Sequence, residues 1–153
     1  MSTELDLKNK LKLWALAILQ ERIATAQAAM QQAQESANAE EKSSVGDKYE
    51  TARAMGHLQK DMHARQLAEA LKDLAALQTV RTDVLYERAG PGAFVQAEGV
   101  AFFISAGLGR QMPEGREVIF LSPKAPMAGV LEGKKVGEEV LFQQRVIVIR
   151  RIY

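Results

Sequence analysis

The chain has 153 residues, of which 47% are hydrophobic and 25% are charged, and its net charge is +1 at pH 7. This composition is typical of a soluble globular protein, and so small a net charge argues against broad electrostatic binding to nucleic acid or to an anionic membrane. Because the chain has no cysteine, disulfide bonds and thiolate zinc sites are excluded.

The one apolar run near the start, Leu11–Leu19, does not predict a membrane anchor or a secretory signal. It is shorter than the roughly 18 apolar residues that a membrane span requires. Lysines at 8, 10 and 12 share its turns, and no small-residue cleavage site follows it. We therefore expect a cytoplasmic protein with no membrane partner.

Glycine and proline divide the chain near residue 80. Only Gly46 and Gly56 precede Thr79, whereas the other nine glycines and all four prolines follow it. Since these residues break helices and mark turns, we expect helices in the first part and short elements in the second. The chain is thus predicted to be an α+β protein, with a helical domain over residues 1–81 and a β-rich domain over residues 82–153.

The first predicted helix carries an apolar stripe. Four large side chains recur at spacings of four, three and four residues: Leu7, Leu11, Trp14 and Ile18. This is the spacing of one helix face, and alanines continue it more thinly towards Ala37. We expect Trp14 to lie in the core at the base of a helix pair.

A break over residues 43–46, Ser-Ser-Val-Gly, separates this helix from a second one. The apolar period then resumes with Ala52, Met55, Met62, Leu67, Ala70, Leu71, Leu74 and Leu77. Folding the chain back at Gly46 pairs the two stripes, which predicts a long antiparallel α-helical hairpin of the coiled-coil type. We expect a monomer in isolation, and the alternative is a hairpin that dimerises into a four-helix bundle.

Beyond residue 82, short runs rich in Val, Ile and Phe alternate with Gly and Pro turn signals. The predicted strands are Ala93–Ala97, Val100–Ser105, Glu117–Leu121, Glu139–Phe142 and Arg145–Ile152. Residues 107–113 are predicted to form a loop and residues 125–131 a short helix. The pattern is that of a small α+β domain.

The segment 44–53 has two carboxylates at the start of the second helix. Asp47 and Glu50 are three residues apart, so they lie on one helix face with their Cβ atoms about 5–6 Å apart. In one interpretation they are structural, with Asp47 or Ser44 capping the helix and Glu50 reaching back to the chain. In the other they help to hold Mg²⁺, which takes oxygen ligands and would receive the remaining ones from a partner. The residues alone leave both interpretations open.

The same segment resembles the tip of a known protein family. Residues 46–52, Gly-Asp-Lys-Tyr-Glu-Thr-Ala, resemble the G-D-x-x-E-N-A tip of the bacterial Gre transcript cleavage factors, which are transcription elongation factors. Residues 122–123, Ser-Pro, and 133–140, Gly-Lys-Lys-Val-Gly-Glu-Glu-Val, are similar to S-P and G-K-K-V-G-D-E-V in the Gre C-terminal domain. Since the motifs occur in the same order, the resemblance covers nearly the whole chain.

The resemblance implies an FKBP-like C-terminal domain that docks at the mouth of the secondary channel of bacterial RNA polymerase. The hairpin would enter the channel, where Asp47 and Glu50 would help to hold the second Mg²⁺ of the polymerase and orient a water molecule. Backtracked RNA would then be cut near its 3′ end by two-metal phosphodiester hydrolysis. The chain would not be an enzyme but would stimulate the endonuclease activity of the polymerase. It would have no cofactor of its own, and its partners would be the polymerase and the 3′ end of the nascent RNA.

Four other tip residues are candidates for contacts with RNA or polymerase: Lys48, Tyr49, Thr51 and Arg53. Thr51 stands where the family has Asn, and Arg53-Ala54 stands where an acidic and an aromatic residue are common. The first alternative function is therefore a regulator or inhibitor that occupies the secondary channel without supporting cleavage. The second alternative is a dimeric coiled-coil adaptor.

Overall fold

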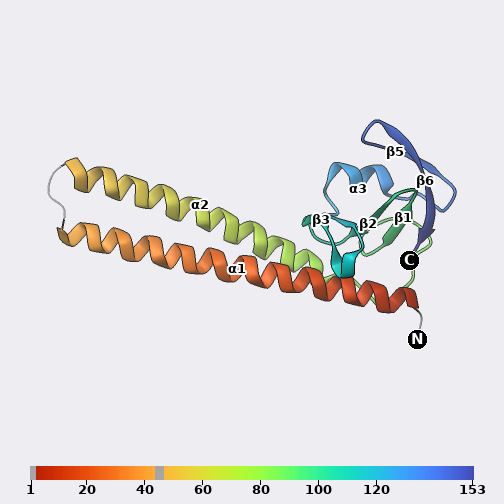
Figure 1. The fold of residues 1–153 in the computed structure, drawn as a ribbon, viewed down its shortest axis with the longest axis horizontal. Helices are drawn as coiled ribbons and strands as arrows, with labels where there is room; N and C mark the ends of the chain where they lie inside the picture. Colours follow the sequence, from red (N-terminus) through yellow and green to blue (C-terminus); the bar gives the residue numbers. More distant parts are fainter. Residues whose placement is uncertain (1–2, 44–46) are drawn as a thin grey trace. The chain divides into compact units, whose positions relative to one another are not determined.

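The computed structural model of the chain describes residues 3–43 and 47–153, without the side chains of residues 40–43, 47–49 and 52. Within these described residues the chain forms two long helices, α1 (Thr3–Ser43) and α2 (Asp47–Gln78), followed by a six-stranded mixed sheet (Figure 1). The predicted α+β class, with a pair of long N-terminal helices ahead of a β-rich part, is therefore confirmed.

The two long helices form where helix breakers are missing. From Thr3 to Gln78 the sequence has no proline, and its two glycines are Gly46, in the break between the helices, and Gly56. Acidic residues occupy the first turn of α1, where the helix dipole favours a negative charge. The helices lie side by side and run in opposite directions (Figure 1). The predicted break at Gly46 lies outside the described residues, but the helix ends on either side of it agree with it.

The chain forms two compact units. One is Ile18–Lys72, which contains the distal parts of both long helices and is called the distal unit below. The other contains the start of α1 up to Ala17 together with Asp73–Tyr153. The first turns of α1 thus group with the β-rich part of the chain, and the predicted domain boundary at residue 82 stays a prediction.

Small residues form the seam between the helices in the distal unit. A Cβ atom added to Gly56 would lie 3.5 Å from the Cβ atom of Ala37, so the helices approach closely there. The buried residues of this unit include three alanines: Ala26, Ala33 and Ala70. A narrow seam of this kind is typical of a two-stranded coiled coil with little apolar surface to bury.

The buried face of α1 differs from the predicted one. Leu11 is buried as expected, but the fully buried positions around it are Lys8, Ala15 and Leu19, and Trp14 is 37% exposed. The prediction that Trp14 belongs to the core is therefore wrong. Because an α-helix turns by about 100° per residue, burial of Ala15 rotates the neighbouring indole towards the surface.

The buried face of α2 also differs in part from the prediction. Ala70 and Leu77 are buried, whereas Met55, Met62 and Leu71 are 53%, 48% and 47% exposed. These three residues do not belong to the seam, contrary to the prediction. Where Gly56 meets Ala37 the helices approach too closely for a long side chain to lie between them, so the neighbouring Met55 lies outside the seam.

The six strands of the described chain pair in the order β3-β4-β2-β1-β6-β5. Their bounds are β1 (Phe94–Ala97), β2 (Val100–Ile104), β3 (Gly109–Gln111), β4 (Val118–Leu121), β5 (Glu139–Phe142) and β6 (Arg145–Ile152). All neighbours are antiparallel except β2 and β4, which are parallel. A 3₁₀ turn (Pro113–Gly115) precedes β4, and the short helix α3 (Pro126–Leu131) follows it.

The strand predictions are confirmed to within about a residue, apart from β3. That strand lies in the segment predicted to be a loop, so this prediction is wrong. Gly109, Arg110 and Gln111 have no apolar alternation, and they are extended because they pair with β4 at the edge of the sheet. An edge strand of three residues gives little signal in the sequence.

Both faces of the central strands are buried. On one face, Val95, Phe102 and Ile104 form a core with Ala128 and Leu131 of α3. On the other face three fully buried phenylalanines lie in register across β1, β2 and β4: Phe94, Phe103 and Phe120. The successive side chains of each strand thus supply two separate apolar layers.

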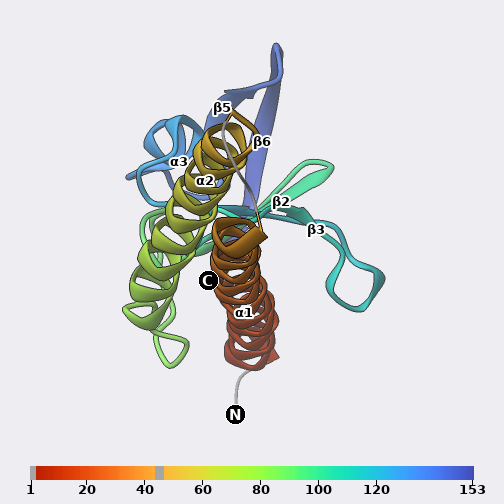
Figure 2. The ribbon, with the colours of Figure 1, turned by 90° about the vertical axis from the view of Figure 1, so that its left-hand side faces the viewer.

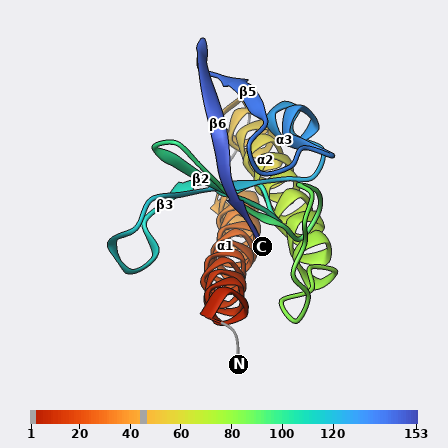
Figure 3. The ribbon, with the colours of Figure 1, turned by 90° about the vertical axis from the view of Figure 1, so that its right-hand side faces the viewer.

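A two-residue turn joins β5 to β6, and Figure 3 shows this strand pair beside α3. Phe142 pairs with Arg145, and the two residues between them, Gln143 and Gln144, have φ angles of 51° and 63°. Positive φ at both central positions is the pattern of a type I′ turn, in which Asn-Gly is the usual sequence. The turn therefore carries backbone strain that glycine would relieve.

Candidate acidic tip of the helix pair

The predicted acidic site lies at the end of the helix pair where α1 stops and α2 begins (Figure 2). Asp47, Lys48 and Tyr49 form the first turn of α2, and their side chains lie outside the described residues. The predicted alternative cap, Ser44, also lies outside the described residues. The structure thus confirms that the helix begins at the acidic motif.

Three of the predicted site residues have described side chains, namely Glu50, Thr51 and Arg53, and all three are exposed. Glu50 follows Asp47 by three residues in the first turn of the helix. Negative charge is favoured there because the backbone N–H groups at the start of a helix point towards it. The two acidic positions therefore share the first turn of α2, where the Glu50 side chain is exposed, and the exposed Arg53 follows three residues later in the chain.

The chemistry of the tip suits a hard cation. Mg²⁺ takes oxygen ligands, keeps several waters, and is often bound by only one or two carboxylates of a protein together with substrate phosphates. Asp47 and Glu50 supply two carboxylates at the spacing of one helix turn. In the part of the chain that the structure describes, no group of three or more His, Asp or Glu side chains is arranged to hold a metal ion.

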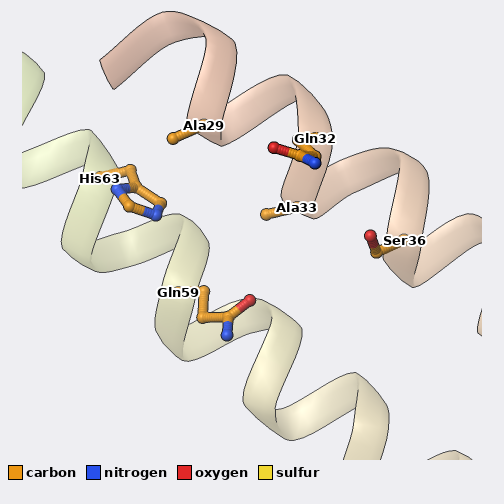
Figure 4. Close-up of a pocket in the computed structure, with 6 residues that line it drawn as sticks. All are labelled: Ala29, Gln32, Ala33, Ser36, Gln59 and His63. Atoms are coloured by element: carbon orange, nitrogen blue, oxygen red, sulfur yellow. The ribbon is translucent and has the colours of Figure 1, made fainter. Parts of the chain in front are cut away.

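A shallow groove lies farther along the distal unit, between the two helices (Figure 4). Its volume is about 250 Å³, and its lining residues are Ala29, Gln32, Ala33, Ser36, Gln59 and His63. Figure 4 shows the alanines of α1 on one side and Gln59 and His63 of α2 on the other. The amide, hydroxyl and imidazole groups allow water to occupy the groove, so the seam is polar at this level.

A second polar feature is a buried lysine at the start of α1. Lys8 is 0% exposed, and its Nζ atom donates a hydrogen bond of 2.7 Å to the carbonyl oxygen of Val84. The same Nζ atom lies 4.5 Å from the centre of the Tyr86 ring, at the distance of a cation–π contact. Burial lowers the pKa of Lys8 from 10.5 to about 8, and the charge of Asp83 offsets only part of this effect.

Lys12, one turn later, acts in the same way on the same segment. Its Nζ atom donates a hydrogen bond of 2.7 Å to the carbonyl oxygen of Val80. Asn9 adds a longer contact of 3.5 Å between its Oδ1 atom and the hydroxyl of Thr82. The start of α1 is thus bonded to the irregular segment 80–86 that follows α2.

Sequence reasoning missed this lysine pair. The available signal is the position of Lys8, which lies three residues before Leu11 and seven before Ala15 and therefore on the buried face of α1. A lysine on an apolar face indicates either a stem that reaches the surface or a buried charge with partners. Here the partners are a backbone carbonyl and an aromatic ring.

Comparison with known proteins gives no relative. No protein-family model, no curated protein and no solved structure matches the chain. Among the described residues, no helix combines the length and the apolar character needed to cross a membrane. The function has to be inferred from the residues and their geometry.

Proposed function

We propose that the chain is a Gre-like transcription elongation factor that binds bacterial RNA polymerase in its secondary channel and stimulates cleavage of backtracked RNA. The observation that carries the proposal is the start of α2 at Asp47, with Glu50 exposed in the same turn at the end of a paired-helix rod. The C-terminal sheet with α3 on one face is, in this proposal, the FKBP-like docking domain. Because bacterial RNA polymerase works in the cytoplasm, the proposal also implies a cytoplasmic protein.

The tip residues have distinct roles in this proposal. The Mg²⁺ ions belong to the polymerase and supply the activated water and the stabilisation of the leaving oxygen. The carboxylates of Asp47 and Glu50 contribute oxygen ligands and accept a hydrogen bond from the attacking water. Lys48, Tyr49, Thr51 and Arg53 contact RNA or the walls of the channel. The polymerase is the catalyst, and the chain completes its site.

The proposal is tested by RNA cleavage in a stalled, backtracked elongation complex. Asp47→Asn and Glu50→Gln keep the size of each side chain but remove its charge, so the cleavage rate is expected to fall at least about 100-fold. Binding to the polymerase is expected to change little. Glu69→Gln is the matched control, because Glu69 is also exposed on α2 but lies far from the tip. Unchanged cleavage by the Asp47→Asn/Glu50→Gln double variant would remove the proposal.

A second candidate is a channel-binding regulator that does not support cleavage. Arg53 favours it, since this exposed cation stands where the Gre family commonly has an acidic residue and lies one turn from Glu50. In that case the protein binds the polymerase and slows elongation, and no shortened transcript is formed at any Mg²⁺ concentration. Arg53→Glu is then expected to restore cleavage, which distinguishes this candidate from a chain that never engages the active site.

A further inference from the structure

The exposed side of α2 carries an apolar stripe that the tip chemistry does not use. It consists of Met55, Leu58 and Met62, which are 53%, 64% and 48% exposed, and begins beside Thr51. Positions 51, 55, 58 and 62 are spaced by four, three and four residues, so the four side chains lie on one helix face. The apolar stripe therefore runs continuously from the acidic tip along the helix.

The apolar stripe is separate from the seam that holds the two helices together. Gly56, His63 and Ala70 recur every seven residues and are buried or half-buried. Gly56 lies close to Ala37 of α1, and His63 lines the groove between the two helices. Met55 and Met62 each precede one of these seam residues by one position. Since each residue advances the helix by about 100°, the apolar stripe points well away from α1. The side chains of the apolar stripe therefore take no part in the contact between the two helices.

A second copy of the chain is a poor partner for the apolar stripe. A stable interface buries about 800 Å² on each side and uses about 20–30 residues of each partner. In the described part of the distal unit, four large apolar side chains are exposed, and the fourth, Leu71, lies on the opposite side of α2. Three side chains suffice for one contact within a longer interface, but they do not suffice for a dimer.

We propose that the apolar stripe docks against an apolar protein wall of the cleft that receives the acidic tip. This inference rests on the proposed function, because the wall is then part of the polymerase channel. Glu50 and Thr51 are adjacent in the chain, so a cleft deep enough to admit the tip also surrounds the next turns of α2. Two of the three side chains are methionines, whose flexible thioethers adapt to an irregular protein surface. The contact holds the rod at its working depth while the tip acts.

The test separates binding from cleavage. The concentration that gives half-maximal cleavage, and the maximal cleavage rate, are measured for the wild type, Leu58→Gln and Leu58→Gln/Met62→Gln. The double variant is expected to need at least about ten times more protein for half-maximal cleavage, and to approach the wild-type rate at saturation. Leu71→Gln is the matched control and is expected to behave as the wild type. Far-UV circular dichroism establishes that each variant keeps its helices.

The possible outcomes distinguish this inference from the proposed function. If the double variant has the wild-type half-maximal concentration while Glu50→Gln loses cleavage, the apolar stripe is not a docking surface and the proposed function stands. If the wild type neither binds the polymerase nor supports cleavage, both fail. A wild-type dimer in analytical ultracentrifugation that Leu58→Gln dissociates would assign the apolar stripe to a second copy and overturn the inference.

Discussion

The wild-type protein is expected to become more stable between about pH 8 and pH 10, and Lys8→Met is expected to remove this rise. Lys8 is fully buried, and its pKa falls from an ordinary value of 10.5 to about 8 in the folded protein. Between these two values the unfolded chain binds more protons than the folded protein. The free energy of unfolding therefore increases with pH through this window, and below pH 8 the folded protein bears the whole cost of the buried charge.

The size of this effect follows from the two pKa values of Lys8. Each pKa unit corresponds to about 1.4 kcal/mol, so the fall from 10.5 to about 8 is worth about 3 kcal/mol of unfolding free energy. Methionine has a similar length and no charge, so it removes the cost of the buried charge. It also leaves the carbonyl oxygen of Val84 without its donor, at a cost of about 1–3 kcal/mol. The two changes nearly cancel at pH 7. The variant and the wild type are therefore distinguished by how the free energy of unfolding changes with pH.

The assay is urea unfolding followed by far-UV circular dichroism at several pH values from 7 to 10. Lys12→Met is the matched control, because Lys12 also donates a hydrogen bond of 2.7 Å to a carbonyl of the same segment while Lys8 stays in place. That variant is expected to keep the wild-type rise with pH. If the free energy of unfolding changes with pH in the same way for the wild type and Lys8→Met, the reasoning is refuted, because another group then produces the pH dependence.

Two further predictions concern the turn between β5 and β6 and the groove between the long helices. Gln144→Gly is expected to raise the free energy of unfolding by about 1 kcal/mol, because Gln144 has a φ angle of 63°. Thermal unfolding measures this change, and an equal gain with Gln144→Ala would contradict it. Ala33→Leu puts a long side chain at a buried position of the narrow seam and is expected to destabilise the distal unit by about 1–3 kcal/mol in thermal unfolding. Ala28→Leu, at an exposed position of α1, is its control, and an equal loss there would contradict this reasoning.

The elements of the fold follow from local features of the sequence. The ends of α1 and α2 lie at the predicted break, because Gly46 and the polar residues around it interrupt the apolar period. The bounds of β5 and β6 agree with the prediction because both strands are short runs of Val, Ile and Phe beside turn residues. The edge strand β3 has no such run, and its extended form depends on pairing with β4. Local sequence patterns do not show which distant segments of the chain will pair.

The choice of buried face on each long helix also depends on the partner. Trp14 and Ala15 are neighbours, and a hydrophobic period alone favours the larger side chain as the core residue. The structure buries Ala15 and exposes more than a third of Trp14. The same side of α1 carries Lys8 and Lys12, which bind the carbonyl groups of Val84 and Val80, so the buried side is set by a segment far away in the sequence. Sequence periodicity therefore predicted that the helices pair, but did not predict which side of each helix is buried.

The acidic tip depends on neighbouring residues of one helix, whereas the buried lysine depends on residues far away in the sequence. Asp47 and Glu50 could be predicted from sequence because their spacing is a local feature of one helix, and their role as a site stays a prediction. Lys8 was missed because its acceptor, the carbonyl of Val84, lies 76 residues away in the chain. The aromatic ring that faces its charge, that of Tyr86, is equally remote. A contact of this kind becomes visible only when the start of α1 and the segment after α2 lie together.

The lysine pair has a physical reason in the segment that it binds. Residues 80–86 have no regular secondary structure, so their carbonyl groups have neither the helix nor the strand partners that backbone groups normally find. An apolar residue in place of Lys8 would pack well but would leave the Val84 carbonyl without its hydrogen bond. A long side chain with donors at its end reaches that carbonyl from inside the apolar face, while its methylene stem fills the core. The hydrogen bond to Val84 and the Tyr86 ring offset only part of the cost of burying the Lys8 charge. Methionine removes both the remaining cost and the hydrogen bond, so Lys8→Met is expected to be similar to the wild type in stability at neutral pH but different in its response to alkali.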